Sequence, residues 1–311
     1  MILRQNFRAR VLLVPSLMAC VAACSSGKAS SAVSEAGPTP GTMYTKIDDM
    51  EGVSGFIEWT SQSGMTPGFW RTATDCTEGH RISPVFYFAD PYGWSYAALP
   101  TPHETFPGIV STHAARIRTT SPLVGIWGAN MGFDFAELPP FDGGPIWPPL
   151  MGIDAGAPAA GQPCRQGTTR DFNGGTVDLS AYSGITFWAM ATMTGAKAVR
   201  VQLTDRNTDP RGGICNPVDP SNESNCYNGF LVEVAMTDSL TQYTIDFSSL
   251  QQDPSWGYRP DPDVLDLQHV YQMDFSVDLP SCAADSNAKC AGGSPSVAFD
   301  FWIDDLYFVN K

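Results

Sequence analysis

The sequence predicts an all-β protein, an antiparallel β-sandwich of the jelly-roll type with long loops that disulfide bonds staple. Three observations carry this prediction. Apolar and polar residues alternate along many short segments, glycine and proline account for 29 and 25 of the 311 residues, and amphipathic helical patterns are absent. Alternation with a period of two places every second side chain on one sheet face, whereas glycine and proline mark turns. About ten strands at this spacing, without crossover helices, indicate an antiparallel sandwich.

Residues 1–23 have the features of a lipoprotein signal peptide. Three arginines precede an apolar run over residues 11–21 that is too short to span a bilayer. The sequence Val-Ala-Ala-Cys then ends at Cys24, which we expect to be acylated and to become the new N-terminus. Two alternatives stay open, namely lipidation at Cys20 and an ordinary signal peptide that is cleaved near Ala23.

Residues 24–43 are rich in Ser, Gly, Ala and Pro and contain almost no large apolar side chain. Such a segment cannot bury enough surface to fold, so it is predicted to be a flexible tether. Residues 44–311 then form a single β-sandwich domain, with a loop insertion around residues 136–175 where Pro-Pro and Gly-Gly pairs recur. We expect a lipid-anchored protein of the bacterial cell envelope, at the outer membrane or the cell surface.

The formal net charge is −14, and removal of the signal peptide with its arginines makes the chain more acidic. Nucleic acid is not an expected partner, because phosphate binding needs clustered lysine and arginine. An acidic surface suits divalent cations and neutral ligands such as glycans. It also promotes solubility outside the cell, which is by itself a sufficient explanation.

The first half of the domain contains the less regular strand segments. Residues 81–89 alternate around Ile82 and Phe86, residues 95–99 can extend them, and a proline-rich bend separates this region from an alternating segment at residues 113–119. The strands expected in this half are residues 47–50, 55–60, 68–72, 81–89, 113–119 and 123–135.

The second half contains the clearest strands. Val199, Val201 and Leu203 alternate with polar residues on one predicted strand, and Phe187 and Trp188 lie on another. Polar cysteine-containing loops at residues 205–228 and 279–294 separate the strands. The strands expected in this half are residues 185–191, 198–204, 229–235, 241–247, 270–277 and 297–309.

Six of the eight cysteines remain for the folded domain if Cys20 and Cys24 belong to the processed N-terminus. An even number in an oxidising compartment indicates disulfide bonds. Six cysteines allow 15 connectivities, so nearest-neighbour pairing is a hypothesis. The expected pairs are Cys215–Cys226, Cys282–Cys290 and, by elimination, Cys76–Cys164.

A zinc site is not expected from this sequence. The mature chain contains no Cys-x-x-Cys motif, and its four histidines lie far apart along the chain. Acidic motifs at the two ends of the domain instead suggest that the ends meet and share a cation.

Four motifs resemble those of a known family. They are Ile-Asp-Asp-Met-Glu-Gly at residues 47–52, Val-Asp-Leu-Ser leading into Gly-Ile and Phe-Trp at residues 177–188, Tyr-Thr-Ile-Asp-Phe with a later Gln and Trp-Gly at residues 243–257, and Phe-Trp-Ile-Asp-Asp-Leu-Tyr-Phe at residues 301–308. In this order they are similar to galactose-binding-like jelly rolls, in particular family 11 carbohydrate-binding modules and related carbohydrate-binding lipoproteins. The resemblance covers about residues 44–309 and is weakest across residues 92–170. It implies the fold more firmly than sugar binding, because the fold also serves complex-assembly and adhesion proteins.

The resemblance implies a structural calcium ion between the first and last strands. The matching positions are Asp48, Asp49, Glu51, Asp304 and Asp305, and calcium prefers six to eight oxygen ligands. Adjacent strand residues face opposite sides, so Asp304 and Asp305 can reach one ion only if a bulge intervenes. Strict alternation places Asp305 on the core face, where it needs a cation or an arginine. Hydrogen bonds to backbone N–H groups, or exposure at a strand end, are the alternatives.

Candidate ligand-binding residues lie in loops. Tyr92, Trp94 and Trp256 could form an aromatic platform for sugar rings, and Asp205 and Asn207 could donate and accept hydrogen bonds. Aromatic side chains also pack in cores and loops, and Asx-rich segments also arise from turn chemistry alone.

These features favour a non-catalytic surface lipoprotein that binds a glycan or polysaccharide through a calcium-stabilised jelly roll. No motif marks a catalytic nucleophile, and no catalytic residue is predicted. A polysaccharide-active hydrolase or lyase is the first alternative, because two carboxylates across a groove would suffice for it. A scaffold or adhesion protein of the cell envelope is the second.

Overall fold

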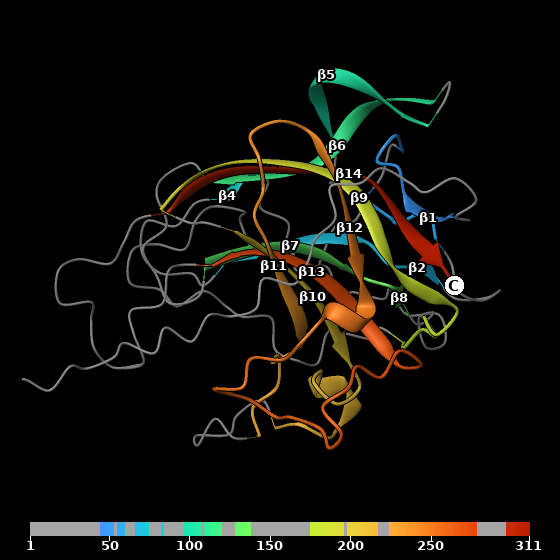
Figure 1. Ribbon diagram of the computed structural model, residues 1–311, viewed down its shortest axis with the longest axis vertical. Helices are drawn as coiled ribbons and strands as arrows, with labels where there is room; N and C mark the ends of the chain where they lie inside the picture. Colours follow the sequence, from blue (N-terminus) through green and yellow to red (C-terminus); the bar gives the residue numbers. More distant parts are fainter. Residues whose placement is uncertain are drawn as a thin grey trace, which may run out of the picture. The chain divides into compact units, whose positions relative to one another are not determined.

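A computed structural model describes residues 44–52, 55–59, 66–74, 82–83, 96–106, 109–119, 128–137, 175–195, 198–216, 224–278 and 297–311 (Figure 1). The predicted signal peptide, the tether and most of the predicted loop insertion lie outside these residues.

Two antiparallel sheets form a sandwich, which confirms the predicted fold class. The larger sheet has seven strands in the order β12-β9-β14-β6-β4, with β1 beside β14 and β5 beside β6 (Figure 1). All of its pairings are antiparallel. Its strands are β1 (Tyr44–Asp48), β4 (Ile82–Ser83), β5 (Ala97–Phe106), β6 (Ile109–Thr119), β9 (Tyr182–Thr194), β12 (Thr241–Asp246) and β14 (Ala298–Asn310).

The second sheet has five strands in the order β11-β10-β13-β7-β3, again with antiparallel pairings. A third, two-stranded sheet pairs β2 (Thr66–Pro67) with β8 (Ala136–Glu137). The strands of the five-stranded sheet are β3 (Trp70–Thr74), β7 (Gly128–Asp134), β10 (Val199–Asp205), β11 (Phe230–Val234) and β13 (Val270–Asp278).

One hydrophobic core fills the space between the two large sheets. Phe275 of the five-stranded sheet contacts Phe187 and Phe301 of the seven-stranded sheet, with ring centroids 5.5 and 6.3 Å apart. Burial of each such ring contributes about 1.5–3 kcal/mol. The alternation predicted for residues 198–204 is confirmed, because Val199 and Val201 belong to this core.

Strand β14 is the centre of the seven-stranded sheet. It pairs with β9 along most of its length, with β6 along its first part and with β1 along its last part. Tyr44 lies opposite Val309, so the two ends of the folded domain meet, as the acidic motifs at these ends suggested.

The predicted register of Asp305 is wrong, because β14 contains a bulge. The pairing with β9 breaks between Asp304 and Tyr307, and Asp305 has a φ of 49°. The extra residue moves Asp305 off the core face and returns Leu306 to it, as its place in the core shows. The bulge falls where β14 changes its partner from β6, whose last pair is at Ile303, to β1.

The predicted proline-rich bend is also wrong, because residues 97–106 form the ten-residue strand β5. This strand contains Pro100 and Pro102 and pairs only with β6 among the described residues, with two breaks in register. Proline is compatible with such an edge strand, because no ladder hydrogen bond is required from it on the open side. The next strand, β6, accordingly begins at Ile109 rather than at His113.

Residues 55–59 do not form the predicted strand and contribute only an isolated bridge between Phe56 and Phe69. The N–H groups of Glu58 and Trp59 both donate to Ile47 O, which is incompatible with a regular ladder. Of the predicted strand 81–89 only β4 lies in the described residues, and residues 123–127 of the predicted strand 123–135 lie outside them. The bounds of the other strands differ from the predicted ones by a few residues, as is usual for strand ends.

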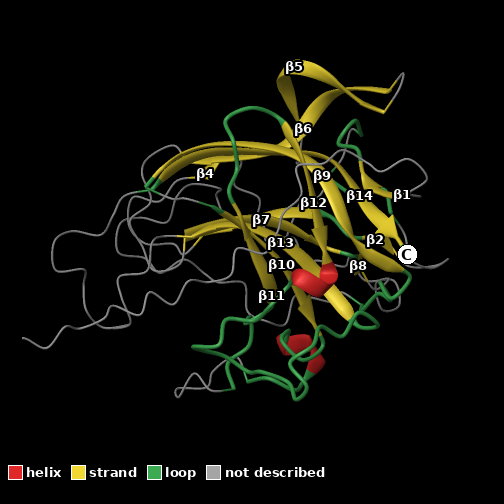
Figure 2. Cartoon of the chain, in the orientation of Figure 1, coloured by secondary structure: helices red, strands yellow, loops and turns green. Residues whose placement is uncertain are grey.

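Helical structure in the described residues is limited to two short 3₁₀ turns, η1 (Pro210–Gly212) and η2 (Phe247–Ser249) (Figure 2). A search of the same residues for a helix of sufficient length and apolarity to cross a membrane finds none.

Candidate functional site

The outer face of the five-stranded sheet is polar. On β10, Arg200, Gln202 and Thr204 alternate with core residues and therefore point away from the core. Gln272 and Asp274 occupy the equivalent positions on β13, and both are buried. Buried polar groups need partners, so this face must contain its own hydrogen-bond network.

Six residues supply the centre of that network, and we call them the arginine cluster: Arg71, Asp134, Asp209, Arg211, Gln272 and Asp274.

Arg71 spans two strands of the face. Its Nη1 donates to Asp274 Oδ1 at 2.7 Å and its Nη2 donates to Gln272 Oε1 at 2.7 Å. Gly132 of β7 pairs with Arg71 on one side and with Asp274 on the other. A Cβ atom at Gly132 would lie 2.3 Å from Asp274 Oδ1. The glycine therefore leaves room for the ion pair to cross β7.

Arg211 follows β10 and holds the other side of the cluster. Its Nε and Nη2 donate to the two carboxylate oxygens of Asp209 at 2.8 and 2.7 Å, and Nη2 lies 3.3 Å from Asp134 Oδ1. The guanidinium lies over the Tyr271 ring, 4.4 Å from its centroid. Burial would lower the pKa of Arg211, but the charges of Asp134 and Asp209 outweigh it and raise that pKa. The Arg211 guanidinium therefore stays protonated, and its hydrogen bonds to Asp209 hold it in one orientation.

Opposite charges lie in contact throughout the cluster, in which two arginines face three aspartates. Burial raises the pKa of Asp274, while the neighbouring Arg71 cation acts in the opposite direction. Each of the three carboxylates contacts an arginine. The result is a polar base whose buried carboxylates are all paired with a cation.

Two exposed aromatic rings lie at the edge of this face. The side chains of Tyr227 and Trp256 belong to residues that are 43% and 40% exposed. Gln202 Nε2 on the outer face donates to Tyr227 O at 3.1 Å, and Asn228 Nδ2 donates to Trp256 O at 2.5 Å. The segments that carry the two rings are therefore joined to each other and to the polar face. Trp256 is thus accessible to solvent, as a ring that stacks on a sugar must be, and its role in ligand binding stays a prediction.

The predicted disulfide bond Cys215–Cys226 is present, with a Cα–Cα distance of 5.1 Å. It closes the loop that ends immediately before Tyr227. The two other predicted pairs lie outside the described residues, and so do several predicted site residues. These cysteines and site residues are Cys24, Cys76, Tyr92, Trp94, Cys164, Cys282 and Cys290.

Asp205 and Asn207 form a turn. The carboxylate of Asp205 accepts hydrogen bonds from Asn207 N at 3.0 Å, from Thr208 N at 3.1 Å and from Asp266 N at 2.9 Å. Asn207 Nδ2 donates to the same carboxylate at 3.2 Å. This geometry matches the alternative of turn chemistry, and a role of the two residues in ligand binding stays a prediction.

The five predicted calcium ligands do not form one group. Asp48 is buried, and its carboxylate accepts hydrogen bonds from Trp70 Nε1 at 2.7 Å, from Tyr96 Oη at 2.7 Å and from Met50 N at 2.9 Å. Burial raises the pKa of Asp48 to about 7, although these three donors oppose the rise. Three neutral donors of the described residues therefore contact this carboxylate.

Asp49 lies beside Asp48 and Glu58, and carboxylate oxygens of the three are within 4.8 Å of one another. Lys46 already supplies a positive charge there, because its Nζ lies 2.8 Å from Asp49 Oδ2 and also forms an ion pair with Glu58.

Glu51 accepts hydrogen bonds from the N–H groups of Thr112 and His113 at 2.6 and 2.8 Å. Burial acts to raise its pKa, but the hydrogen bonds from Thr112 and His113 outweigh this effect and lower the pKa to about 2. Ser111 Oγ contacts both Glu51 Oε1, at 3.0 Å, and Asp304 Oδ2, at 2.7 Å, which links the two ends of the domain.

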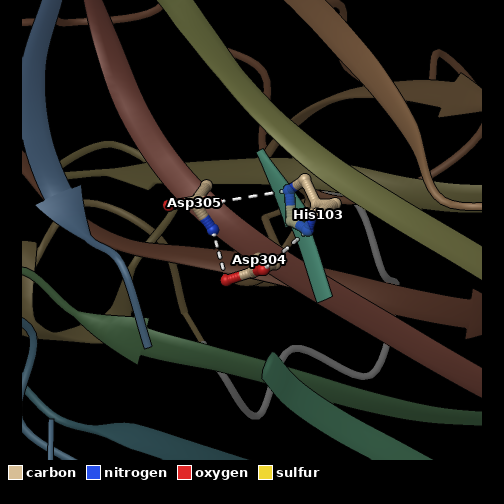
Figure 3. A group of neighbouring side chains, drawn as sticks. All are labelled: His103, Asp304 and Asp305. Atoms are coloured by element: carbon tan, nitrogen blue, oxygen red, sulfur yellow. Dashed lines mark hydrogen bonds and ion pairs between the residues drawn. The ribbon is translucent and has the colours of Figure 1, made fainter. Parts of the chain in front are cut away.

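Asp304 and Asp305 lie with His103 on the side of β14 that β5 covers (Figure 3). His103 Nδ1 is 3.7 Å from Asp304 Oδ2, and His103 Nε2 is 3.4 Å from Asp305 Oδ2. The two aspartates are 0% and 1% exposed. The bulge brings both carboxylates to the same histidine, which adjacent residues of a regular strand could not do. Such a group could hold a metal ion.

No lysine or arginine of the described residues pairs with these two carboxylates. Burial, and then the charge of Asp305, raise the pKa of Asp304 to about 9. Ser111 Oγ donates to Asp304, and Thr105 Oγ1 donates to Asp305. These hydroxyls orient the carboxylates without supplying a charge.

Sequence reasoning missed His103 and the arginine cluster. A usable pattern existed for His103, because it and Thr105 are two residues apart and so share one face of a strand. That strand was not predicted, however. Arg71 and Arg211 are 140 positions apart, and no local pattern joins them.

Comparisons with known proteins give matches at the level of structure. No protein-family model matches the chain, and no curated protein does. A family 11 carbohydrate-binding module of the cellulosomal cellulase Lic26A-Cel5E of Clostridium thermocellum matches with a TM-score of 0.41 and 12% identity, over 86% of this chain and 95% of that one. A family 11 module from Clostridium thermocellum in complex with a β-1,3-1,4-mixed-linked tetrasaccharide gives a TM-score of 0.39, 12% identity and the same coverages. A family 30 carbohydrate-binding module gives 0.37 and 10% identity, over 78% of this chain and 92% of that one. At these scores the similarity concerns the arrangement of strands and says nothing about the ligand.

Proposed function

We propose that this protein is a non-catalytic carbohydrate-binding protein, and that the glycan binds along β10 and β11 between the arginine cluster and the exposed rings of Tyr227 and Trp256. The observation that carries the proposal is the pairing of two exposed aromatic side chains with a preorganised polar sheet face. A pyranose ring has apolar C–H faces and a polar hydroxyl edge, so it needs both kinds of surface.

The charge state of this surface supports a neutral ligand. Both arginines of the cluster are engaged by its three aspartates, so an anionic ligand is not favoured there. Arg200 and Glu233 lie outside the cluster and form an exposed pair whose Nε and Oε1 atoms are 3.4 Å apart. The Arg200 guanidinium can donate to ligand hydroxyl groups and the Glu233 carboxylate can accept from them at little cost, because exposed pairs are weak.

The same contacts favour binding over hydrolysis. A glycosidase needs one carboxyl group as a proton donor and a second one as a base or nucleophile. Asp134, Asp209 and Asp274 all form ion pairs with arginine, so each is already engaged by a cation rather than placed to donate a proton to a glycosidic oxygen.

Affinity for a glycan is the direct test. A glycan array, followed by calorimetry with mixed-linked β-1,3-1,4-glucan as one probe, should detect binding by the purified protein. Trp256→Ala and Tyr227→Ala should each weaken it by about tenfold or more, since stacking contacts are worth about 1–1.5 kcal/mol or more.

Val264→Ala is the matched control, because Val264 is also an exposed apolar residue in the loop region after β12. Its affinity should equal that of the wild type. A negative array, or equal losses in all three variants, would contradict the proposed surface.

Anchoring at a bacterial membrane through an acylated Cys24 belongs to the same proposal and rests on the Val-Ala-Ala-Cys sequence. Cys24→Ser should abolish palmitate labelling and move the protein to the aqueous phase in a detergent partition, whereas Cys20→Ser should not. The reverse result would assign the anchor to Cys20.

Calcium at the ends of the domain stays a prediction. Lys46 forms ion pairs with Asp49 and Glu58, and Asp48 accepts hydrogen bonds from the neutral donors Trp70 Nε1 and Tyr96 Oη. Asp304 and Asp305 are two adjacent buried carboxylates that accept hydrogen bonds from Ser111 Oγ, Thr105 Oγ1 and the Asp305 N–H, and no lysine or arginine of the described residues pairs with them.

A further inference from the structure

We propose that His103, Asp304 and Asp305 bind a divalent transition-metal ion of the zinc class, rather than calcium. The site lies on the seven-stranded sheet and does not depend on the glycan-binding surface, which is on the other sheet. It would act as a clamp that ties the edge strand β5 to the central strand β14.

The first argument is charge. Two adjacent carboxylates are almost completely buried, and within the described residues no lysine or arginine reaches them. Buried carboxylates are paired, coordinate a metal or become neutral. Arg116 lies on the neighbouring strand β6, but it is engaged by Asp300 and by the Trp302 ring.

The second argument is the type of ligand atom. One nitrogen of His103 and one oxygen from each aspartate lie within 4.8 Å of one another. A tetrahedral ion with bonds of about 2.0–2.2 Å separates its ligand atoms by about 3.3–3.6 Å. His103 Nδ1 would be the coordinating nitrogen, and its distance of 3.7 Å from Asp304 Oδ2 is near this range. Imidazole suits zinc, cobalt, nickel and copper, whereas calcium takes oxygen ligands almost throughout.

The third argument is a set of polar atoms without partners. His103 Nδ1 is buried and has no hydrogen-bond partner in the part of the chain that the structure describes. The same is true of Nε1 of Trp188, whose ring contacts the His103 ring at a centroid distance of 4.8 Å. An unpaired buried nitrogen costs about 1–3 kcal/mol. A metal ion would use the histidine nitrogen, and a water on that ion would provide an acceptor for an indole N–H.

The surrounding hydroxyls fit a metal site as well. Ser111 donates to Asp304 and Thr105 donates to Asp305, while His103 Nε2 lies 3.4 Å from Thr105 Oγ1. Hydrogen bonds of this kind hold the ligands of a metal in position. Three protein ligands would leave one coordination position for water.

Metal binding by the purified full-length protein tests the proposal, with an affinity tag that contains no histidine. After treatment with EDTA and dialysis, calorimetry with Zn²⁺ should show one bound ion per chain, and Co²⁺ should give the visible absorption of a tetrahedral site. Zn²⁺ should also raise the midpoint of thermal unfolding, whereas Ca²⁺ at the same concentration should not.

His103→Gln should weaken Zn²⁺ binding at least about 100-fold, since even residues that only orient a metal ligand contribute about 10–100-fold. His113→Gln is the control, because His113 is also on the β5–β6 hairpin but contacts Glu51. Its Zn²⁺ affinity should not change.

Two results would overturn the proposal. One is Zn²⁺ binding that is equal in the wild type and His103→Gln. The other is Ca²⁺ binding that is tighter than Zn²⁺ binding and is insensitive to His103→Gln, which would assign the two aspartates to a calcium site. Circular dichroism of each variant separates lost binding from lost folding. Loss of glycan binding alone would leave this proposal intact.

Discussion

The outer faces of the two sheets bury charge in different ways. On the five-stranded sheet, Asp274 contacts Arg71 in an ion pair that crosses β7. On the seven-stranded sheet, Asp304 and Asp305 are equally buried, but a histidine and hydroxyl groups are their neighbours. On the first face every carboxylate of the arginine cluster contacts an arginine, and the face can serve as a rigid surface for a neutral ligand. The second one has a deficit of positive charge, which a cation would correct.

Loss of Arg71 should have the largest effect. Arg71→Met removes the partner of Asp274 and a donor to Gln272, which leaves an uncompensated buried carboxylate. Breaking a buried ion pair in this way costs about 3–5 kcal/mol. Urea denaturation that is followed by tryptophan fluorescence would measure the loss of unfolding free energy.

Arg200→Met is the matched control on the same sheet face. Arg200 and Glu233 are 28% and 41% exposed as side chains, and such pairs contribute about 0–1 kcal/mol. Equal effects of the two substitutions would show that the buried Arg71–Asp274 ion pair contributes no more to stability than the exposed Arg200–Glu233 pair.

Asp48 offers an intermediate case, because it is buried among neutral donors. Its folded-state pKa of about 7 exceeds the ordinary value of 3.8, so the folded state binds a proton that the unfolded state releases. The stabilisation is complete below about pH 4 and is lost as the pH rises through about 7. At about 1.4 kcal/mol for each pH unit, the loss amounts to at most about 4 kcal/mol.

Asp48→Asn should remove this loss, because the amide is neutral at every pH. The difference in unfolding free energy between the wild type and Asp48→Asn should therefore change with pH between 4 and 7. Asp238→Asn, at an exposed position, should run parallel to the wild type. A constant difference for Asp48→Asn would mean that Asp48 does not titrate in this range.

Sequence alternation was sufficient to predict the sandwich and most strands of the second half. Val199, Val201 and Leu203 repeat with a period of two, and the core confirms their common face. The disulfide bond Cys215–Cys226 was predictable for a similar reason, because its cysteines are only 11 residues apart. In both cases the information is local.

The sites depend on interactions that are not local. The position of Asp305 results from a bulge at which β14 changes its partner from β6 to β1. No residue pattern within the strand predicts this bulge. His103 lies 201 positions before Asp304 in the chain, on strand β5. Motifs therefore indicated that the acidic ends meet, but the tertiary pairing determines which of their carboxylates lie together.

Substitution of Asp304 on the seven-stranded sheet should have the smallest effect on stability. Because the pKa of Asp304 is raised to about 9, its carboxyl group is protonated in metal-free protein at pH 7. Asp304→Asn then exchanges one neutral group for another, and its amide oxygen can still accept a hydrogen bond from Ser111. We expect the unfolding free energy to stay within about 1 kcal/mol of the wild type, because no buried charge is lost and this hydrogen bond is retained. The contrast with Arg71→Met is the informative result, since only Arg71→Met removes a buried charge. Urea denaturation in EDTA would measure it, and a loss as large as that of Arg71→Met would show that Asp304 already has a compensating partner in the metal-free protein.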